Sequence, residues 1–220
     1  MNERGVALIL VLLVMMTLSA LSLSLALMVS TESRVAATYR DGIEVLYGAE
    51  AAFERVLPDL TPDADLNAVL AGATTSSFID GPAGVRRMPD GTFMDLRALT
   101  SMVNCGRPVC TDVEFDEVRD DRPWGRNNPR WQLYAHGALE SPSRVYGVVW
   151  VADDPSETDM DPFTDGGPST SLEPGDENPG RGRLTLMAHG YGPAGTRRII
   201  EATVARAEQG FIVLSWREVR

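Results

Sequence analysis

Residues 6–30, VALILVLLVMMTLSALSLSLALMVS, decide the fold at the N-terminal end, because 25 successive positions carry no charged side chain and no Pro or Gly. A membrane-spanning helix needs about 20 predominantly apolar residues at a rise of about 1.5 Å each. The apolar region of a cleaved secretory signal is only about 7–15 residues long. The run therefore predicts one continuous helix that spans a membrane and stays on the protein.

The helical pattern continues through residues 31–57 and ends at Pro58, which cannot extend a helix. Apolar side chains recur at steps of three and four, so they form one stripe on an otherwise polar helix. The stripe consists of Val35, Tyr39, Ile43, Leu46, Ala49, Ala52, Phe53 and Val56. We expect this amphipathic half of the helix to pack on a soluble domain.

Residues 58–220 form that domain, and their C-terminal third is typical of β-strands. The stretch RWQLYAHGAL alternates apolar and polar side chains, and four further apolar runs follow with short links. Consecutive strands joined in this way predict an antiparallel sheet. Residues 59–130 are less informative: the stretch 58–72 suggests a turn and a short helix, and the Asp-Gly turns between short apolar pieces after it fit strands or an irregular loop. The fold class is therefore α+β, with a long N-terminal helical spine on an antiparallel sheet.

The two cysteines, Cys105 and Cys110, lie in the stretch NCGRPVC. Their spacing differs from the C-x-x-C of redox enzymes and zinc ribbons. In a chain with an export-type segment, a short-range disulfide is the favoured interpretation, and two free thiols are the alternative.

Residues 153–177 contain nine acidic residues, four prolines and no basic residue, and predict an exposed loop between two strands. Asp159, Asp161 and Asp165 are candidate ligands for Ca²⁺, which prefers carboxylate oxygens. The stretch does not fit the EF-hand template, because Phe163 and Thr164 occupy two of the required positions. A solvated acidic loop without a metal is the alternative.

The composition argues against two classes of function. A formal net charge of −11 is unsuited to binding nucleic acid through a broad basic face. Neither His136 nor His189 stands in a known catalytic motif, and the chain has no nucleophile elbow, no H-E-x-x-H and no phosphate-binding glycine loop. The sequence predicts no catalytic residue, so we expect a protein that is not an enzyme.

A leader of five residues ending in Arg4-Gly5, followed by this helix and an antiparallel sheet, resembles the type IV pilin superfamily. Residues 4–57 resemble the N-terminal region of PilX-like minor pilins. The resemblance implies that a prepilin peptidase cuts after Gly5 and that Val6 becomes the N-methylated first residue. It divides the chain into a leader (1–5), a transmembrane and filament-core helix (6–30), an amphipathic spine (31–57) and a head (58–220).

Position 10 departs from the pilin pattern. Typical pilins have Glu at the fifth mature position, where it neutralises the terminal amine of an adjoining subunit, and this chain has Leu10. The departure implies a subunit with none beyond it, at the filament tip. The partners implied are other minor and major pilins, with an inner-membrane anchor and periplasmic head before assembly and a surface pilus afterwards.

Two other functions stay open at this point. The tip pseudopilin of type II secretion also lacks the glutamate, so a pseudopilin is the alternative. A membrane-anchored periplasmic protein that is never cleaved would retain Met1. No sequence feature identifies what the head contacts.

Overall fold

The structure, a computed structural model, describes residues 3–115, 130–157, 161–166 and 180–219. The chain divides into two compact units, Met1–Asp41 and Gly42–Arg220. The first unit contains the N-terminal part of helix α1 (Glu3–Val56). The second unit, which we call the head, contains the last 15 residues of α1, from Gly42 to Val56, and all other elements.

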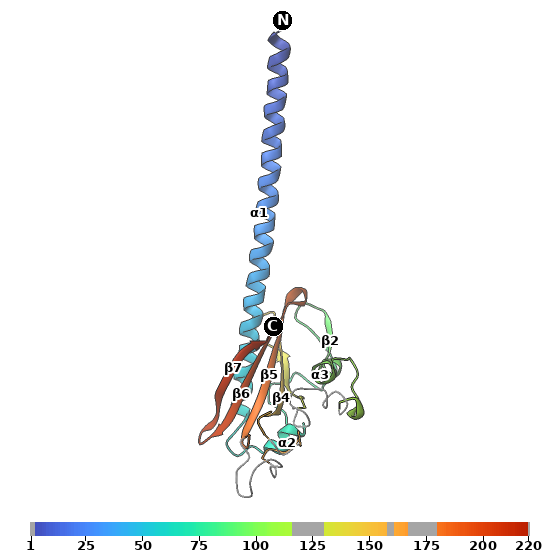
Figure 1. The fold of residues 1–220 in the computed structure, drawn as a ribbon, viewed down its shortest axis with the longest axis vertical. Helices are drawn as coiled ribbons and strands as arrows, with labels where there is room; N and C mark the ends of the chain where they lie inside the picture. The colour runs from blue at the N-terminus through green and yellow to red at the C-terminus, as the bar shows by residue number, and fades with distance from the viewer. Residues whose placement is uncertain (1–2, 116–129, 158–160, 167–179, 220) are drawn as a thin grey trace. The chain divides into compact units, whose positions relative to one another are not determined.

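The head is built on a five-stranded antiparallel sheet in which sequence neighbours are also spatial neighbours (Figure 1). The strands are β3 (Gln132–Ala138), β4 (Tyr146–Asp153), β5 (Arg183–Tyr191), β6 (Arg197–Ala207) and β7 (Gly210–Val219). Their order is β3-β4-β5-β6-β7, so each strand pairs with the next one along the chain. The connections are short except for the one between β4 and β5, which contains residues 154–182. This confirms the predicted α+β class with an antiparallel sheet.

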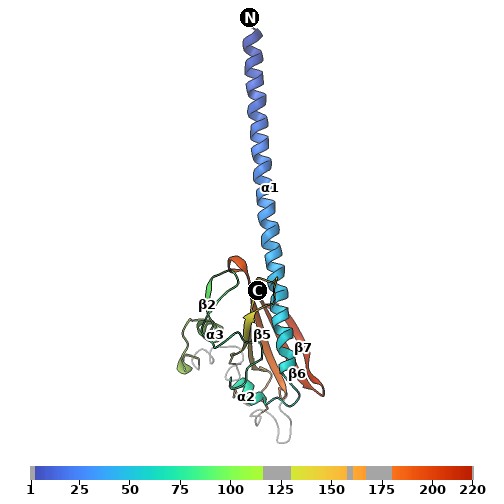
Figure 2. The same ribbon diagram turned by 180° about the vertical axis from the view of Figure 1, so that it is seen from behind.

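The head portion of α1 lies against one face of this sheet, as the view from behind shows (Figure 2). Ala49, Ala52, Phe53 and Val56 of the predicted stripe are buried there. Val35 and Tyr39, which belong to the first unit, are 64% and 72% exposed. Within the head, the stripe packs on the sheet through these four residues and the partly buried Leu46.

The other face of the sheet carries a second apolar cluster. Helix α3 (Leu96–Cys105) and the two-stranded ribbon of β1 (Val85–Arg87) and β2 (Phe93–Asp95) supply its cover. Trp150 on β4 is fully buried in it, and its indole N–H donates to the Thr100 hydroxyl at 2.9 Å. With cover on both faces, every residue of β4 is buried.

Three short elements complete the described fold. Helix α2 (Leu66–Leu70) follows the 3-10 turn η1 (Leu57–Asp59) and adds Leu66, Val69 and Leu70 to the core beneath α1. The 3-10 turn η3 (Pro193–Gly195) connects β5 to β6. The short helix predicted within residues 58–72 is present as α2.

The acidic segment 153–177 corrects one expectation. Its beginning is not an exposed loop: Asp153, Asp154 and Glu157 are buried, at 4%, 6% and 0% exposure. Asp153 is the last residue of β4, and every residue of this strand is buried, so the segment begins in the interior of the head. Buried carboxylates need hydrogen-bond donors, and Glu157 accepts one such bond from the Gly166 backbone N–H.

Candidate assembly helix and its attachment to the head

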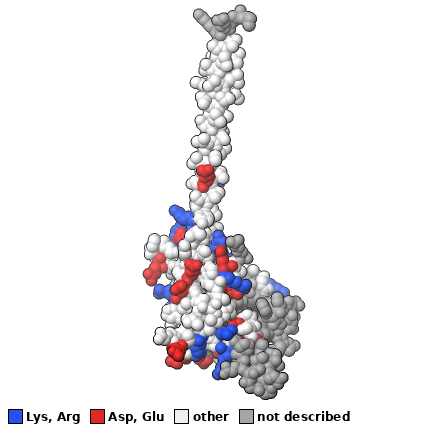
Figure 3. Space-filling model, turned by 60° about the vertical axis from the view of Figure 1, so that its left-hand side comes forward, with Lys and Arg blue, Asp and Glu red and all other residues white. Residues whose placement is uncertain are grey.

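The first candidate site is the apolar part of α1. Every described side chain from Val6 to Arg40 is exposed, including all the large apolar ones. Figure 3 shows the part of this helix nearer the N-terminus without a charged side chain on the visible face. Apolar surface in water costs about 25 cal/mol per Å², so this segment needs a membrane or other helices around it. By length and composition it can cross a membrane.

The polar groups in this segment are compatible with an apolar environment. The Thr17 hydroxyl donates to the Val14 carbonyl and the Ser22 hydroxyl donates to the Leu18 carbonyl, both at 2.9 Å. Such bonds satisfy a hydroxyl within its own helix, where lipid offers no partner. The two hydroxyls therefore add little cost to membrane insertion.

The predicted processing junction and the predicted tip position both lie in this helix. Gly5 and Val6 fall within α1, and Leu10 stands four residues after Val6. Residues four apart lie on the same side of a helix, one turn apart. Val6 and Leu10 are exposed by 59% and 57%. A charge at position 10 would thus lie on the same side of the helix as Val6.

The attachment of α1 to the head depends on close backbone approach. A Cβ on Gly190 of β5 would overlap the Val45 carbonyl oxygen and lie 3.1 Å from the Ala49 nitrogen. A Cβ on Gly147 of β4 would lie 2.6 Å from the Cβ of Ala52. Glycine at these two positions lets the helix backbone rest directly on the sheet. Val45, which lies off the predicted stripe, is fully buried as a result.

Two ion pairs join the same part of α1 to the connection between β3 and β4. Glu44 accepts from the Arg144 backbone N–H at 3.1 Å and pairs with the Arg144 guanidinium at 3.2 Å. Arg55, three turns further along, lies 3.8 Å from Glu140. Both partners come from the β3–β4 connection, so this connection holds two points of the helix.

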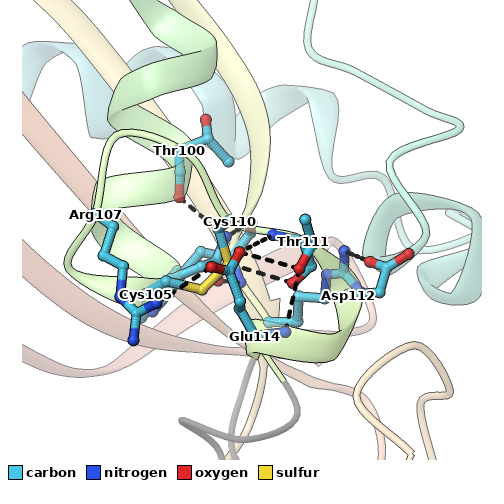
Figure 4. Close-up of a disulfide and its surroundings, with 10 residues drawn as sticks. Thr100, Cys105, Arg107, Cys110, Thr111, Asp112 and Glu114 are labelled. Carbon is cyan, nitrogen blue, oxygen red and sulfur yellow. Dashed lines mark hydrogen bonds and ion pairs between the residues drawn. A yellow bond between two sulfur atoms is a disulfide. The ribbon is translucent and has the colours of Figure 1, made fainter.

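The structure joins Cys105 and Cys110 by a disulfide (Figure 4). Cys105 is the last residue of α3, and residues 111–114 form a helix start in which Thr111 and Glu114 exchange hydrogen bonds. Bonds from the Thr111 N–H and hydroxyl lower the pKa of Glu114 below its ordinary value. Arg107 adds an ion pair to Glu114 at 3.2 Å. The disulfide and this cap together fix the loop after α3.

Arg130 connects this loop to the acidic segment. Its guanidinium pairs with Asp112 at 2.5 Å and lies over the ring of Phe115 at 4.9 Å and that of Phe163 at 5.3 Å. Cation–π contacts of this kind contribute about 0.5–1 kcal/mol when exposed. Arg130 thus joins two segments that the sequence treats as separate loops.

The structure describes two of the three candidate calcium ligands, Asp161 and Asp165. Asp159 lies outside the described residues. Asp161 accepts from the Phe163 N–H and the Thr164 hydroxyl within its own turn. Asp165 instead lies with Asp153 and Glu157, with carboxylate oxygens within 4.8 Å of one another. The Asp165 carboxylate also accepts a hydrogen bond from the Gly182 N–H at 2.6 Å, and this bond holds Asp165 next to the start of β5. Calcium binding stays a prediction.

Both histidines are buried sheet residues with structural partners. His136 Nδ1 lies 3.0 Å from Asp80 and 3.2 Å from the Tyr146 hydroxyl. Its pKa is lowered by burial, against the opposing effect of Asp80. His189 Nδ1 lies 2.8 Å from the Tyr191 hydroxyl, and burial lowers its pKa to about 3 while it raises that of Tyr191 to about 12.

Comparison with known proteins supplies the class. Residues 4–54 match the family model described as PilX N-terminal. The N-terminal region of this chain is therefore similar to the N-terminal region of PilX-like type IV pilins, in keeping with the long helix and antiparallel sheet. Within that class the match supports a type IV pilus minor pilin, a structural role. Comparisons with curated proteins and with solved structures give no match.

The residues that sequence reasoning missed are those that attach α1 to the head. Gly147 and Gly190 stand within predicted strands, and a glycine inside a strand signals either a bulge or close approach of another backbone. That signal was available. The acidic group of Asp153 and Glu157 had no such signal, because their burial depends on residues more than twenty positions away.

Proposed function

We propose that this protein is a minor pilin that takes part in type IV pilus assembly, in the complex that initiates the filament or occupies its tip. The observation that carries the proposal is the family match over residues 4–54. Within the matched region stand 25 uncharged residues, which are exposed along the helix. These residues need a membrane before assembly and neighbouring pilin helices after it.

Assembly would proceed through the N-terminal helix. The prepilin peptidase removes residues 1–5, Val6 becomes the methylated first residue, and the apolar segment anchors the subunit in the inner membrane with its head in the periplasm. Packing with the helices of other minor and major pilins then transfers the segment from lipid into the filament. The ion pairs at Glu44 and Arg55 keep the head attached to its helix.

Leu10 favours the tip. A buried carboxylate at this depth of the apolar segment costs about 2.5–3.5 kcal/mol or more unless it is paired. Shaft subunits recover that cost by pairing with the amine of the adjoining subunit. A subunit with Leu10 forms no such pair and avoids the cost. This suits the filament tip, because no further subunit lies beyond it.

The experiment is deletion and complementation in the native cell. Deletion should strongly reduce surface pili, and the full-length chain should restore them. Immunogold labelling of the head should find it at filament ends. Normal piliation and motility after deletion would contradict the proposal.

A pseudopilin at the tip of a type II secretion pseudopilus is the second candidate, and Leu10 favours it equally. The same deletion strain distinguishes the two. Loss of exported enzymes with intact pili would support the pseudopilin, whereas loss of pili with intact secretion supports the minor pilin.

A further inference from the structure

The two edges of the head sheet are treated differently. At the β3 edge, residues 76–80 run alongside the strand and supply backbone partners: the Ser76 N–H donates to Tyr134, the His136 N–H to Phe78, and the Asp80 N–H to His136, at 2.9–3.1 Å. The Asp80 carboxylate also accepts from the Tyr146 hydroxyl at 3.0 Å. This edge is closed.

The β7 edge is open in the part of the chain that the structure describes. Strand β7 pairs with β6 on one side, with a register shift at Leu214 between the pairs Thr203–Ser215 and Val204–Val213, and it ends the sheet on the other side. Proteins usually protect such an edge with charges, proline, a short strand or a covering segment. Strand β7 has ten residues and no proline.

The side chains along this edge are apolar and exposed. Ile212, Val213, Leu214 and Trp216 expose 54%, 45%, 48% and 46% of their surface. Val213 and Trp216 pair with Val204 and Ala202 of β6 and so share the α1 face of the sheet, while Ile212 pairs with Ala205 and belongs to the opposite face. Apolar surface thus lies on both faces of this edge strand, which has no charge and no proline between residues 211 and 216.

Charge selects the chemistry of the occupant. Residues 211–216 carry no charge. The two charged residues near the end of the strand are already paired with β6: Arg217 with Glu201 at 2.7 Å and Glu218 with Arg198 at 2.9 Å. An uncharged extended segment fits this edge, whereas a charged one would lose hydration without gaining an opposite charge.

Strand direction argues against a second copy. The Arg198 guanidinium at the start of β6 lies 3.1 Å from the Cβ position of Gly42, and Arg206 near its end donates to the Ala64 carbonyl at 2.8 Å. Strand β6 therefore runs in the same direction as Gly42–Val56 of α1, and β7 runs in the opposite direction. Antiparallel pairing of two β7 strands would point the Gly42–Val56 helices of the two heads in opposite directions.

We propose that the outer edge of β7 is a strand-addition site, at which another protein of the pilus assembly adds an extended, uncharged, largely apolar segment antiparallel to β7. The inference rests on the proposed function for the membrane anchor. The proposed function leaves the partner of the head open, and the inference names the surface and the chemistry of that partner. Backbone hydrogen bonds supply affinity in this mode, and alternate side chains supply specificity. The partner segment would contact Ile212 on one face and Val213 and Trp216 on the other.

The test places a photo-crosslinking amino acid, p-benzoylphenylalanine, at position 214 of the full-length chain in the native cell. The control places it at Val109, an equally apolar position that is 71% exposed and distant in sequence from β7. We expect a yield at 214 about tenfold above that at 109, as an ordered strand holds its neighbour in place. Mass spectrometry of the adduct should identify an uncharged segment of a different pilus subunit.

Two results would overturn the inference. One is a yield at 214 no higher than at 109; the other is an adduct formed only with a differently tagged copy of this same chain. A second measurement uses the double variant I212K/L214K, with F93K as control because Phe93 is 72% exposed on β2. The double variant should keep the melting temperature, as surface changes usually do, and lose most of the piliation that F93K restores.

The outcomes separate this inference from the proposed function. If deletion abolishes pili but I212K/L214K restores them fully, the minor pilin stands and the strand-addition site fails. If deletion leaves pili and secretion unchanged, the proposed function itself fails.

Discussion

Gly190 of β5 lies directly against the carbonyl oxygen of Val45 in α1, so that the helix backbone and the sheet touch without an intervening side chain. A Cβ at position 190 would overlap this carbonyl oxygen, so a side chain there must push the helix away from the sheet. Glycine at this position therefore lets Gly42–Val56 of α1 pack closely on the sheet.

We therefore predict that Gly190→Ala destabilises the protein by about 1–3 kcal/mol, the usual cost of overpacking a rigid site. Gly84→Ala is the matched control, since a Cβ there meets nothing within 4 Å. Urea unfolding of the two full-length variants in detergent measures the difference. Equal stability of the two variants would show that α1 does not pack against β5 in this way.

The disulfide gives a second prediction. Replacing Cys105 and Cys110 by serine should lower the free energy of unfolding by about 2 kcal/mol, because the bond closes only a short loop. The fold should survive, since neither core cluster is held together by this loop alone. Reductant should shift the melting temperature of the native chain and leave that of the double-serine variant unchanged. An equal shift in both would place the effect elsewhere.

Stability should fall as the solution is acidified through the range of His189. The folded-state pKa is about 3, and the ordinary value is 6.5. Below pH 6.5 the unfolded chain binds a proton that the folded chain excludes, so the stability is complete above this pH and is lost as the pH falls. From pH 7 to pH 5 the loss should be about 2 kcal/mol from this residue.

The measurement compares the native chain with His189→Phe between pH 7 and pH 5, above the range in which most carboxylates titrate. The groups facing His189 are Trp150 and Tyr191, with Arg197 nearby. The variant should show a shallower pH dependence, and His136 should account for the remainder. Identical slopes would mean that His189 is protonated in the folded state.

Position 10 gives a prediction about placement. Leu10→Glu restores the carboxylate that shaft subunits have, so the variant should be incorporated along the filament as well as at its end. Leu12→Glu is the matched control: it introduces the same charge at a comparably exposed position, on a different side of the helix from Val6. It should reduce membrane insertion without gaining a partner. Immunogold labelling showing the same end-only placement for Leu10→Glu would remove Leu10 as the cause.

Much of the fold follows from local sequence patterns. The uncharged run of residues 6–30 determines the apolar half of α1, and the alternation in residues 131–138 determines β3. Helix α3 was missed, although Asp95 stands at its N-cap and Leu96, Leu99 and Val103 follow at helical spacing. The Gly and Pro turns on both sides obscured a helix of only ten residues.

The remaining features depend on contacts between distant residues. Closure of the β3 edge by residues 76–80 pairs segments more than fifty positions apart, and no local pattern predicts it. No local pattern predicts the position of Arg130 between the rings of Phe115 and Phe163 either. The acidic segment was predicted to be exposed from its charge and its prolines. In the structure Asp153, the last residue of β4, is buried, and so is Glu157, which accepts a hydrogen bond from the Gly166 backbone N–H.

Mass spectrometry of the N-terminus of the protein purified from native membranes tests the account most directly. A pilin-class subunit should begin at N-methylated Val6, with residues 1–5 absent and the whole apolar segment present. A chain that still begins at Met1, or one cut after the apolar segment, would contradict the assignment of this helix to pilus assembly.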